Sequence, residues 1–125
     1  MTLKTLAAQA TLSLAALSVA AAGPAMAHHA FNMYDNGNYT KLTGTVKTWD
    51  WKNPHVFMTL VTDSGELWNV ELSSPNIIGR KGWTAKSLKI GDKVPLTLHP
   101  MKDGSKYGLM VSVVTTAGET LKDKD

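Results

Sequence analysis

The sequence predicts an all-β fold with one short helix, arranged as an OB-fold-like, five-stranded Greek-key small barrel. From residue 41 onward, short segments rich in Val, Leu, Thr and Trp alternate apolar with polar side chains, which is the period-two pattern of half-buried strands. Their order is three strands, a short helix and two strands, as in an OB-fold. A six-stranded small barrel or a split sandwich would have the same order, so both remain alternatives.

Three strands form an antiparallel meander in the first half of this region. A break at Asn53-Pro54 separates the first two, because proline donates no hydrogen bond to a strand ladder. The turn residues Asp63-Ser64-Gly65 separate the second strand from the third. We expect these strands at residues 42–51, 55–62 and 66–72.

A short helix and two further strands complete the predicted barrel. Ser74 precedes Pro75, and a serine N-cap followed by proline at the first helical position is a helix start. The helix should extend to about Arg80. We expect the last two strands at residues 93–99 and 107–116.

The first 27 residues have the features of a signal peptide. Lys4 is their only charge, an apolar stretch follows at residues 12–22, and Ala25 and Ala27 supply the small side chains that signal peptidase requires. Cleavage after Ala27 would make the protein periplasmic or secreted, with no stable membrane span left. We divide the chain into a signal peptide at 1–27, an N-terminal extension of the mature chain at 28–40, an OB-like β-barrel domain at 41–118 and a flexible C-terminal tail at 119–125.

The composition excludes several functional classes. No cysteine is present, so disulfides and thiolate metal sites are ruled out. After the predicted signal peptide, twelve Lys and Arg accompany ten Asp and Glu with the signs interspersed, which argues against nucleic acid as a partner. The chain has no nucleophile–base pair, paired-carboxylate motif or phosphate-binding glycine loop, so we do not expect an enzyme.

All four histidines lie in the predicted mature chain and form a candidate metal site. A terminal histidine offers its α-amine and its ring nitrogen to one metal ion, and nitrogen-rich sites suit copper. The expected register places the histidines of the second and fourth strands on outward faces, together with Glu71. Each histidine alone also has a structural interpretation, as a terminal, strand-end or turn residue. The candidate copper ligands are His28, His29, His55 and His99.

Aromatic side chains form a second candidate site, for a non-metal ligand. Trp49 and Trp51 lie on the expected outer face of the first strand, near Phe57 by strand pairing. OB-folds use such faces to stack oligosaccharides or single-stranded nucleic acid. Arg80, at the end of the helix, could line an anion or peptide site, although its charge also complements the helix dipole. The alternative for the two tryptophans is that they seal the barrel.

Several short motifs occur in a characteristic order. They are Ala27-His28-His29, Asn53-Pro54-His55, Ser74-Pro75-Asn76 and Arg80-Lys81-Gly82-Trp83. As a set, they resemble a family of small exported bacterial proteins classed as a domain of unknown function. The resemblance covers nearly the whole mature chain, and it implies export and the extent of the domain without implying an activity.

These observations predict an exported periplasmic binding protein. One hypothesis is that it binds copper through a mature N-terminal histidine and histidines of the barrel. The alternative is a non-metal OB-fold interaction module that binds a small ligand, a saccharide or a partner protein in the periplasm. The two differ in whether residue 28, His55 and His99 can meet at one metal ion.

Overall fold

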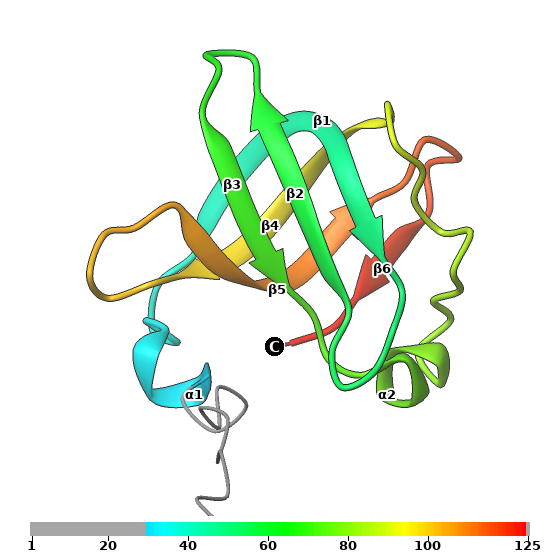
Figure 1. Ribbon diagram of the computed structural model, residues 1–125, viewed down its shortest axis with the longest axis horizontal. Helices are drawn as coiled ribbons and strands as arrows, with labels where there is room; N and C mark the ends of the chain where they lie inside the picture. The colour runs from blue at the N-terminus through cyan, green and yellow to red at the C-terminus, as the bar shows by residue number, and fades with distance from the viewer. Residues whose placement is uncertain (1–29, 125) are drawn as a thin grey trace, which may run out of the picture.

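The computed structural model describes residues 30–124, and these residues form two short helices and six strands around one barrel (Figure 1). No helix in this range is long and apolar enough to cross a membrane. The elements are α1 (Ala30–Met33), β1 (Thr40–Asp50), β2 (Phe57–Thr62), β3 (Leu67–Glu71), α2 (Pro75–Gly79), β4 (Lys93–Pro100), β5 (Tyr107–Val114) and β6 (Thr120–Lys122).

Five of the strands close into a barrel, which confirms the predicted OB-fold-like architecture. The strand order is β3-β2-β1-β4-β5-β6, and an additional pairing of β3 with β5 closes the ring. All of these pairings are antiparallel except β3 with β5, which is parallel. Because α2 lies between β3 and β4 in the chain, the element order is that of an OB-fold.

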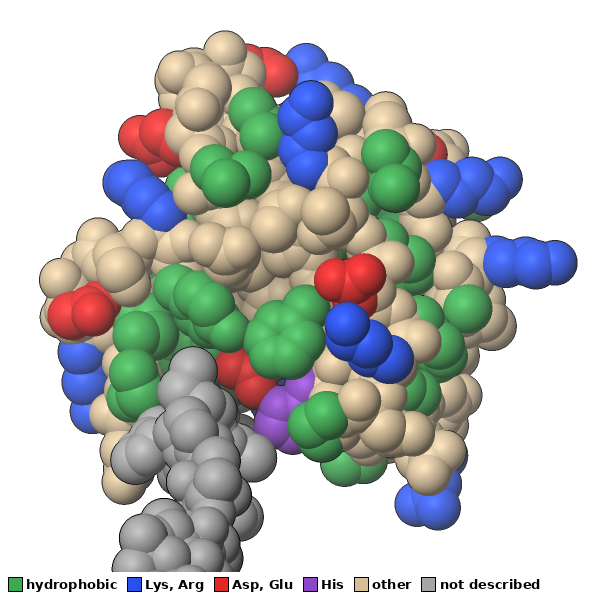
Figure 2. Space-filling view, viewed as in Figure 1, with side chains coloured by type: hydrophobic (Ala, Val, Ile, Leu, Met, Phe, Trp, Pro, Cys, Tyr) green, Lys and Arg blue, Asp and Glu red, His purple; other side chains and the backbone are tan. Residues whose placement is uncertain are grey.

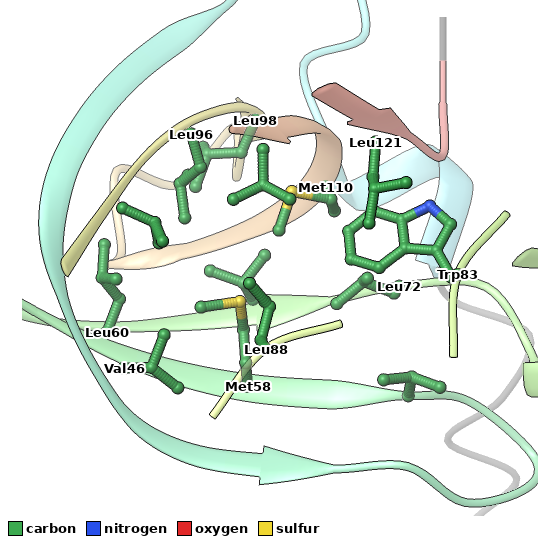
Figure 3. Close-up of a cluster of buried hydrophobic side chains, with 14 of the residues drawn as sticks. Val46, Met58, Leu60, Leu72, Trp83, Leu88, Leu96, Leu98, Met110 and Leu121 are labelled. Carbon is green, nitrogen blue, oxygen red and sulfur yellow. The ribbon is translucent and has the colours of Figure 1, made fainter. Parts of the chain in front are cut away.

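The core fills the barrel with aliphatic and methionine side chains, and Trp83 packs beside Leu121 and Leu72 (Figure 3). Strand side chains of one parity are buried, as in Val46 of β1 and Met58 and Leu60 of β2, all at most 1% exposed. This alternation follows from the pleat, which sends successive side chains to opposite faces.

The α2 helix begins where the sequence predicts. Ser74 has extended backbone, and its side chain accepts a hydrogen bond from the backbone N–H of Ile77, with Pro75 in the first turn. Such a cap satisfies one of the backbone donors that the first turn leaves without a partner. Ile78 then buries its side chain in the core.

A bulge in β1 overturns the predicted placement of its two tryptophans. The register against β2 shifts between Val46 and Thr48, so the extra residue inverts which side chains face inward. Trp49 therefore pairs with the buried Met58 and packs against the core, as does Trp51. The expectation that both tryptophans lie on the outer face is wrong, and they pack at the end of the barrel instead.

Two strands begin later than expected, and three end earlier. Strand β2 begins at Phe57 rather than at residue 55, and β3 begins at Leu67 rather than at residue 66. Strand β1 ends at Asp50 rather than at residue 51, β3 at Glu71 rather than at residue 72, and β5 at Val114 rather than at residue 116. Backbone hydrogen bonds nevertheless continue beyond β2 and β3, since Val56 donates to Ser73 and Leu72 donates to Val56.

The predicted flexible tail at 119–125 is wrong for its described part, residues 119–124. Strand β6 pairs with β5, and Leu121 is 3% exposed. Beyond it, the backbone N–H of Asp123 donates to the carbonyl of Val111 at 2.8 Å. Leu121 also fills the core beside Trp83, so burial of this apolar side chain stabilises the segment together with its hydrogen bonds. The barrel domain thus extends past residue 118.

The described part of the predicted N-terminal extension, residues 30–39, lies against the barrel; we call it the N-terminal segment. The backbone N–H of Asp35 donates to the carbonyl of Pro100 at 2.8 Å, and that of Lys102 donates to the carbonyl of Met33 at 2.9 Å. Tyr34 is 2% exposed and forms an isolated bridge with Met101. Residues 28 and 29 lie outside the described range.

Candidate functional site

One lateral row of residues on the outer face of the barrel contains His99 and also Glu71, the residue that contacts His55. Strand pairing joins Phe57 to Glu71, Glu71 to Leu109 and Leu109 to His99. Paired residues project to the same side of a sheet, so these four side chains share one face. Glu71, Leu109 and His99 are buried although they lie outside the barrel, and contacts from the N-terminal segment explain the burial of Glu71 and His99.

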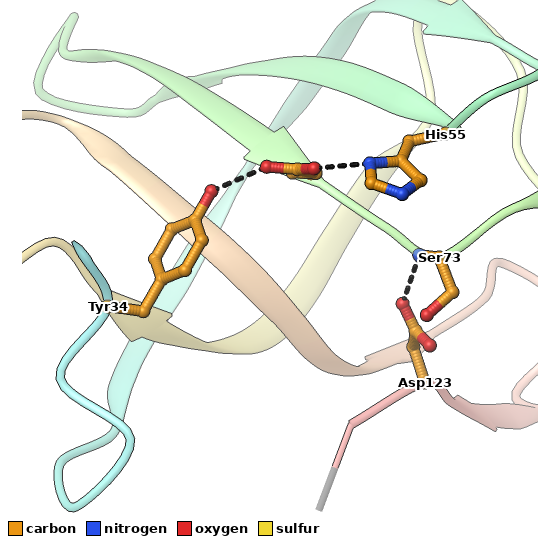
Figure 4. A network of polar contacts seen from close by, with 5 residues as sticks. Tyr34, His55, Ser73 and Asp123 are labelled. Carbon is orange, nitrogen blue, oxygen red and sulfur yellow. Dashed lines mark hydrogen bonds and ion pairs between the residues drawn. The ribbon is translucent and has the colours of Figure 1, made fainter. Parts of the chain in front are cut away.

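A chain of hydrogen bonds runs from the N-terminal segment through Glu71 to His55 (Figure 4). The hydroxyl of Tyr34 donates to Oε2 of Glu71 at 2.7 Å. The other carboxylate oxygen, Oε1, lies 2.5 Å from Nδ1 of His55. The carboxylate is therefore held from both sides, by a residue of the N-terminal segment and by a residue of the β1–β2 loop.

Burial makes this carboxylate a strong acceptor. The side chain of Glu71 is 10% exposed, and hydrogen bonds to charged groups are stronger in such surroundings. Burial raises the pKa of Tyr34 above its ordinary value, and the hydrogen bond to the Glu71 carboxylate raises it further. The pKa of the neighbouring Tyr107 is also raised, first by burial and then by the charge of Glu71. Tyr34 is thus held as a neutral donor.

His55 presents one ring nitrogen to the outside. Its side chain is 30% exposed, and Nδ1 is the nitrogen that contacts Glu71. An ionised carboxylate only accepts, so Nδ1 carries the proton, and a neutral imidazole then has its lone pair on Nε2. Within residues 30–124, no side chain or backbone group forms a hydrogen bond with Nε2 of His55. The arrangement leaves an oriented nitrogen ligand at the surface.

His99 has a different environment. It is 1% exposed, its Nδ1 lies 2.8 Å from the carbonyl oxygen of Asn38, and its ring lies 4.8 Å from that of Tyr39. In the lateral row, Leu109 lies between His99 and Glu71, and Glu71 is the residue that contacts His55. The structure therefore does not bring His55 and His99 together, and the described residues contain no cluster of three or more His, Cys, Asp or Glu side chains that could hold a metal ion.

The aromatic candidates do not form one platform. Trp49 donates from Nε1 to the carbonyl of Ala85 at 2.9 Å, and its ring centroid lies 6.1 Å from that of Trp83. Phe57 pairs with Asp50, the residue after Trp49, so Phe57 and Trp49 project to opposite faces. The prediction of a shared stacking surface is wrong in its geometry.

The remaining candidates lie at the α2 end of the barrel. Trp51 is half-buried and lies 6.0 Å from Trp49 between ring centroids. Arg80 is exposed and is the C-cap residue of α2. A ligand-binding role for Trp49, Trp51, Phe57 and Arg80 stays a prediction.

Glu71 and Tyr34 both build the site, but the sequence indicates only the first of them. Glu71 shares the outward parity of the histidine strands, and that parity is the signal that indicated it. Tyr34 lies in the polar segment before β1, where no periodicity assigns a partner. Only the docking of the N-terminal segment on the barrel brings its hydroxyl to Glu71.

Charged side chains are dispersed over the visible face of the molecule. In Figure 2, lysine and arginine side chains lie mainly around the rim, acidic side chains occur among them, and hydrophobic side chains gather nearer the centre. On this face, the basic side chains do not form a continuous stripe.

Comparison with known proteins gives a family but no activity. No curated protein matched the chain. The model of a family of unknown function, DUF6152, matches residues 15–111, a range that contains α1 to β4 and more than half of β5. The match covers well over half of the 125 residues, so the chain belongs to the DUF6152 family.

Proposed function

We propose that this protein is an exported copper-binding protein in which His55 and a mature N-terminal His28 hold Cu(II). The observation that carries the proposal is the orientation of His55. Its Nδ1 is fixed by Glu71 at 2.5 Å, and its side chain is 30% exposed. Histidine ligands of metal ions very commonly donate their second ring N–H to a carboxylate, which fixes the tautomer and raises ligand basicity.

Glu71 serves as the orienting carboxylate and not as a direct ligand. One oxygen contacts His55 and the other accepts the hydroxyl of Tyr34. The carboxylate is buried between these partners, so further ligands have to come from elsewhere. The N-terminus of the mature chain is a source of such ligands, because it carries an α-amine and two histidines in succession.

The docking of the N-terminal segment supports this assignment. Tyr34 binds the same carboxylate that orients His55, so the start of the described chain is tethered beside the candidate site. His28 precedes Ala30 by two residues, a span of at most about 7 Å. The amine and ring of His28 are therefore available close to the segment that Tyr34 holds.

The donor set favours copper over other metals. An amine and imidazoles are nitrogen donors, no cysteine is present, and Cu(II) binds such sites most tightly among the first-row divalent ions. His29 is a candidate for the remaining position. For His99 we propose a structural role, since its ring holds the carbonyl of Asn38. Export belongs to the proposal, because the amine of His28 exists only after cleavage behind Ala27.

The test is Cu(II) affinity of the mature protein, with its N-terminus at His28 verified by mass spectrometry. His55→Ala should weaken Cu(II) binding by about tenfold or more, since one ligand is lost. A Gly-Ser-Ser-Gly extension before His28 should do the same, because it moves the amine away while both histidines stay. Asn69→Ala, an exposed change on the same face, is the matched control and should bind as the parent does.

Each result decides one part of the proposal. Unchanged affinity in His55→Ala would remove the barrel ligand, and unchanged affinity in the extended protein would remove the terminal chelate. Absence of Cu(II) binding by the parent protein would overturn the copper function as a whole. A competition with Zn(II) should favour Cu(II), and the reverse order would contradict the assigned metal.

A further inference from the structure

We infer that Tyr34 is a positioning residue that couples docking of the N-terminal segment to metal binding at His55. The inference rests on the proposed function and adds a means by which the site assembles. Its basis is the shared carboxylate: Oε2 of Glu71 accepts from Tyr34 at 2.7 Å and Oε1 contacts His55 at 2.5 Å. One side chain thus links the segment that carries the terminal ligands to the ligand on the barrel.

The N-terminal segment docks through backbone and side-chain contacts, and the Tyr34 hydroxyl makes one of them. Two backbone hydrogen bonds connect it to the chain around residues 100–102. At the C-terminal end of the segment, Nδ1 of His99 lies within hydrogen-bond distance of the carbonyl oxygen of Asn38. The ring of Tyr34 stacks on Tyr107 with centroids 6.2 Å apart, and its hydroxyl makes the link to Glu71. Removing that hydroxyl leaves the ring contact in place and breaks the link.

Loss of the Tyr34 hydroxyl affects Glu71 as well as the segment. The carboxylate would lose the donor at its Oε2 oxygen, and loss of a hydrogen bond at a largely buried acceptor is unfavourable. The Glu71 side chain would then be fixed less firmly, because the contact of Oε1 with His55 would hold it from one side. The orientation of Nε2 would become less well defined, which weakens a metal ligand without removing it.

Coupling of this kind acts in both directions. If docking of the N-terminal segment raises the affinity for Cu(II), Cu(II) must stabilise docking by the same factor. The metal would bridge the mature N-terminus and His55, and Tyr34 would reinforce that bridge from the other side of Glu71. The N-terminal segment is then more than a spacer, because it is part of the binding equilibrium.

The first experiment compares two Tyr→Phe substitutions in the mature protein. Tyr34→Phe should lower Cu(II) affinity about threefold to tenfold. This loss is at or below the smallest that is typical when a group that orients a metal ligand is mutated. The substitution should also change the electron paramagnetic resonance spectrum of bound Cu(II). Tyr39→Phe is the matched control in the same segment, since Tyr39 is 58% exposed and the substitution keeps the ring that lies against His99. It should leave affinity and spectrum unchanged.

The second experiment measures the reverse effect by amide hydrogen exchange. Cu(II) should slow exchange of the Asp35 and Lys102 amides, which bond the N-terminal segment to the barrel. The slowing should be lost in His55→Ala. This measurement needs no Tyr34 variant, so it decides the question even if Tyr34→Phe does not fold.

The failures of the two proposals are distinguishable. Identical affinity and spectrum in Tyr34→Phe, or unchanged exchange at both amides on addition of Cu(II), would overturn the coupling while His55-dependent binding stands. Loss of the His55 dependence itself would overturn the proposed copper site and the coupling with it.

Discussion

Two buried carboxylates, Glu71 and Asp123, fasten the two ends of the described chain to the barrel in different ways. Glu71 is bound by side chains, the hydroxyl of Tyr34 and the ring of His55. Asp123 accepts a backbone N–H, that of Ser73, at 2.7 Å. Figure 4 shows both groups in one view. The first carboxylate connects the protein interior to an exposed ring nitrogen, and the second connects two pieces of backbone.

The contacts around Asp123 are those of a structural anchor. Lys81 donates from Nζ to the backbone carbonyl of Asp123, and Trp83 donates from Nε1 to the carbonyl of Lys122 at 2.9 Å. Within residues 30–124, Oδ1 of Asp123 and Oγ of Ser73 have no hydrogen-bond partner, but both atoms are enclosed. Asp123 contacts the backbone N–H of Ser73 and the side chain of Lys81, and neither partner is a histidine. Glu71, in contrast, contacts the partly exposed ring of His55. Burial of a carboxylate alone is therefore a poor guide to function, and the nature of its partners is a better one.

The largest effect should come from removing the C-terminal anchor. Deleting residues 119–125 removes β6 and uncovers Trp83, and we expect a loss of about 3–5 kcal/mol in the free energy of unfolding. Urea unfolding followed by tryptophan fluorescence measures it, and a protein lacking Asp125 alone is the control. An unchanged unfolding midpoint would mean that this end contributes no stability.

Asp123→Ala should be the next largest effect on stability. It leaves the buried N–H of Ser73 without its acceptor, which costs about 2–3 kcal/mol. Asp123→Asn keeps an acceptor oxygen and should lose less. Affinity for Cu(II), measured by competition titration at a temperature where both variants are folded, should match that of the parent. A loss of affinity comparable to that of His55→Ala would show that the two carboxylates are not functionally distinct.

Glu71→Gln tests the other carboxylate with the same conservative change. Glutamine retains an oxygen for one partner but does not carry the charge that orients His55, so Cu(II) affinity should fall about tenfold to a hundredfold. The comparison with Asp123→Asn is direct, because each variant replaces one buried carboxylate by its amide. Equal Cu(II) affinities in the two variants would contradict the assigned roles.

The smallest effect concerns stability at high pH. Because the pKa of Tyr34 is raised in the folded protein, its contribution to stability is complete below the ordinary value near 10 and is lost as pH rises above it. Above pH 10, the parent should lose up to about 1.4 kcal/mol more per pH unit than Tyr34→Phe. Parallel pH dependence of their urea midpoints would argue against a buried, neutral Tyr34.

The overall fold was predictable because it depends on patterns that act over short distances. Alternation identified β1 to β5, and Ser74-Pro75 identified the start of α2. The bulge after Val46 was not predictable, since one inserted residue changes which face Trp49 occupies and leaves the composition of the strand unaltered. Strand β6 was missed for a related reason, because it contains one core residue, Leu121, in a charged segment.

The candidate site was only partly predictable. Strand alternation correctly placed Glu71 on the same outward face as the histidines of the second and fourth strands. Alternation gives the face of a side chain but not its distance from others, so it did not show that His55 and His99 lie apart. The contact of Glu71 with His55 depends on where the β1–β2 loop directs its last residues. The burial of His99 depends on the N-terminal segment, whose docking is a long-range contact without a local signal.

The central claim is that Nε2 of His55 is a ligand of the bound copper. Pulsed electron paramagnetic resonance of the Cu(II)-loaded mature protein detects the remote nitrogen of each coordinated imidazole, and it measures ligation independently of affinity. In His55→Ala the spectrum should lose the contribution of one imidazole, while Asn69→Ala should retain the parent spectrum. The same number of coordinated imidazoles in His55→Ala and in the parent would contradict the claim.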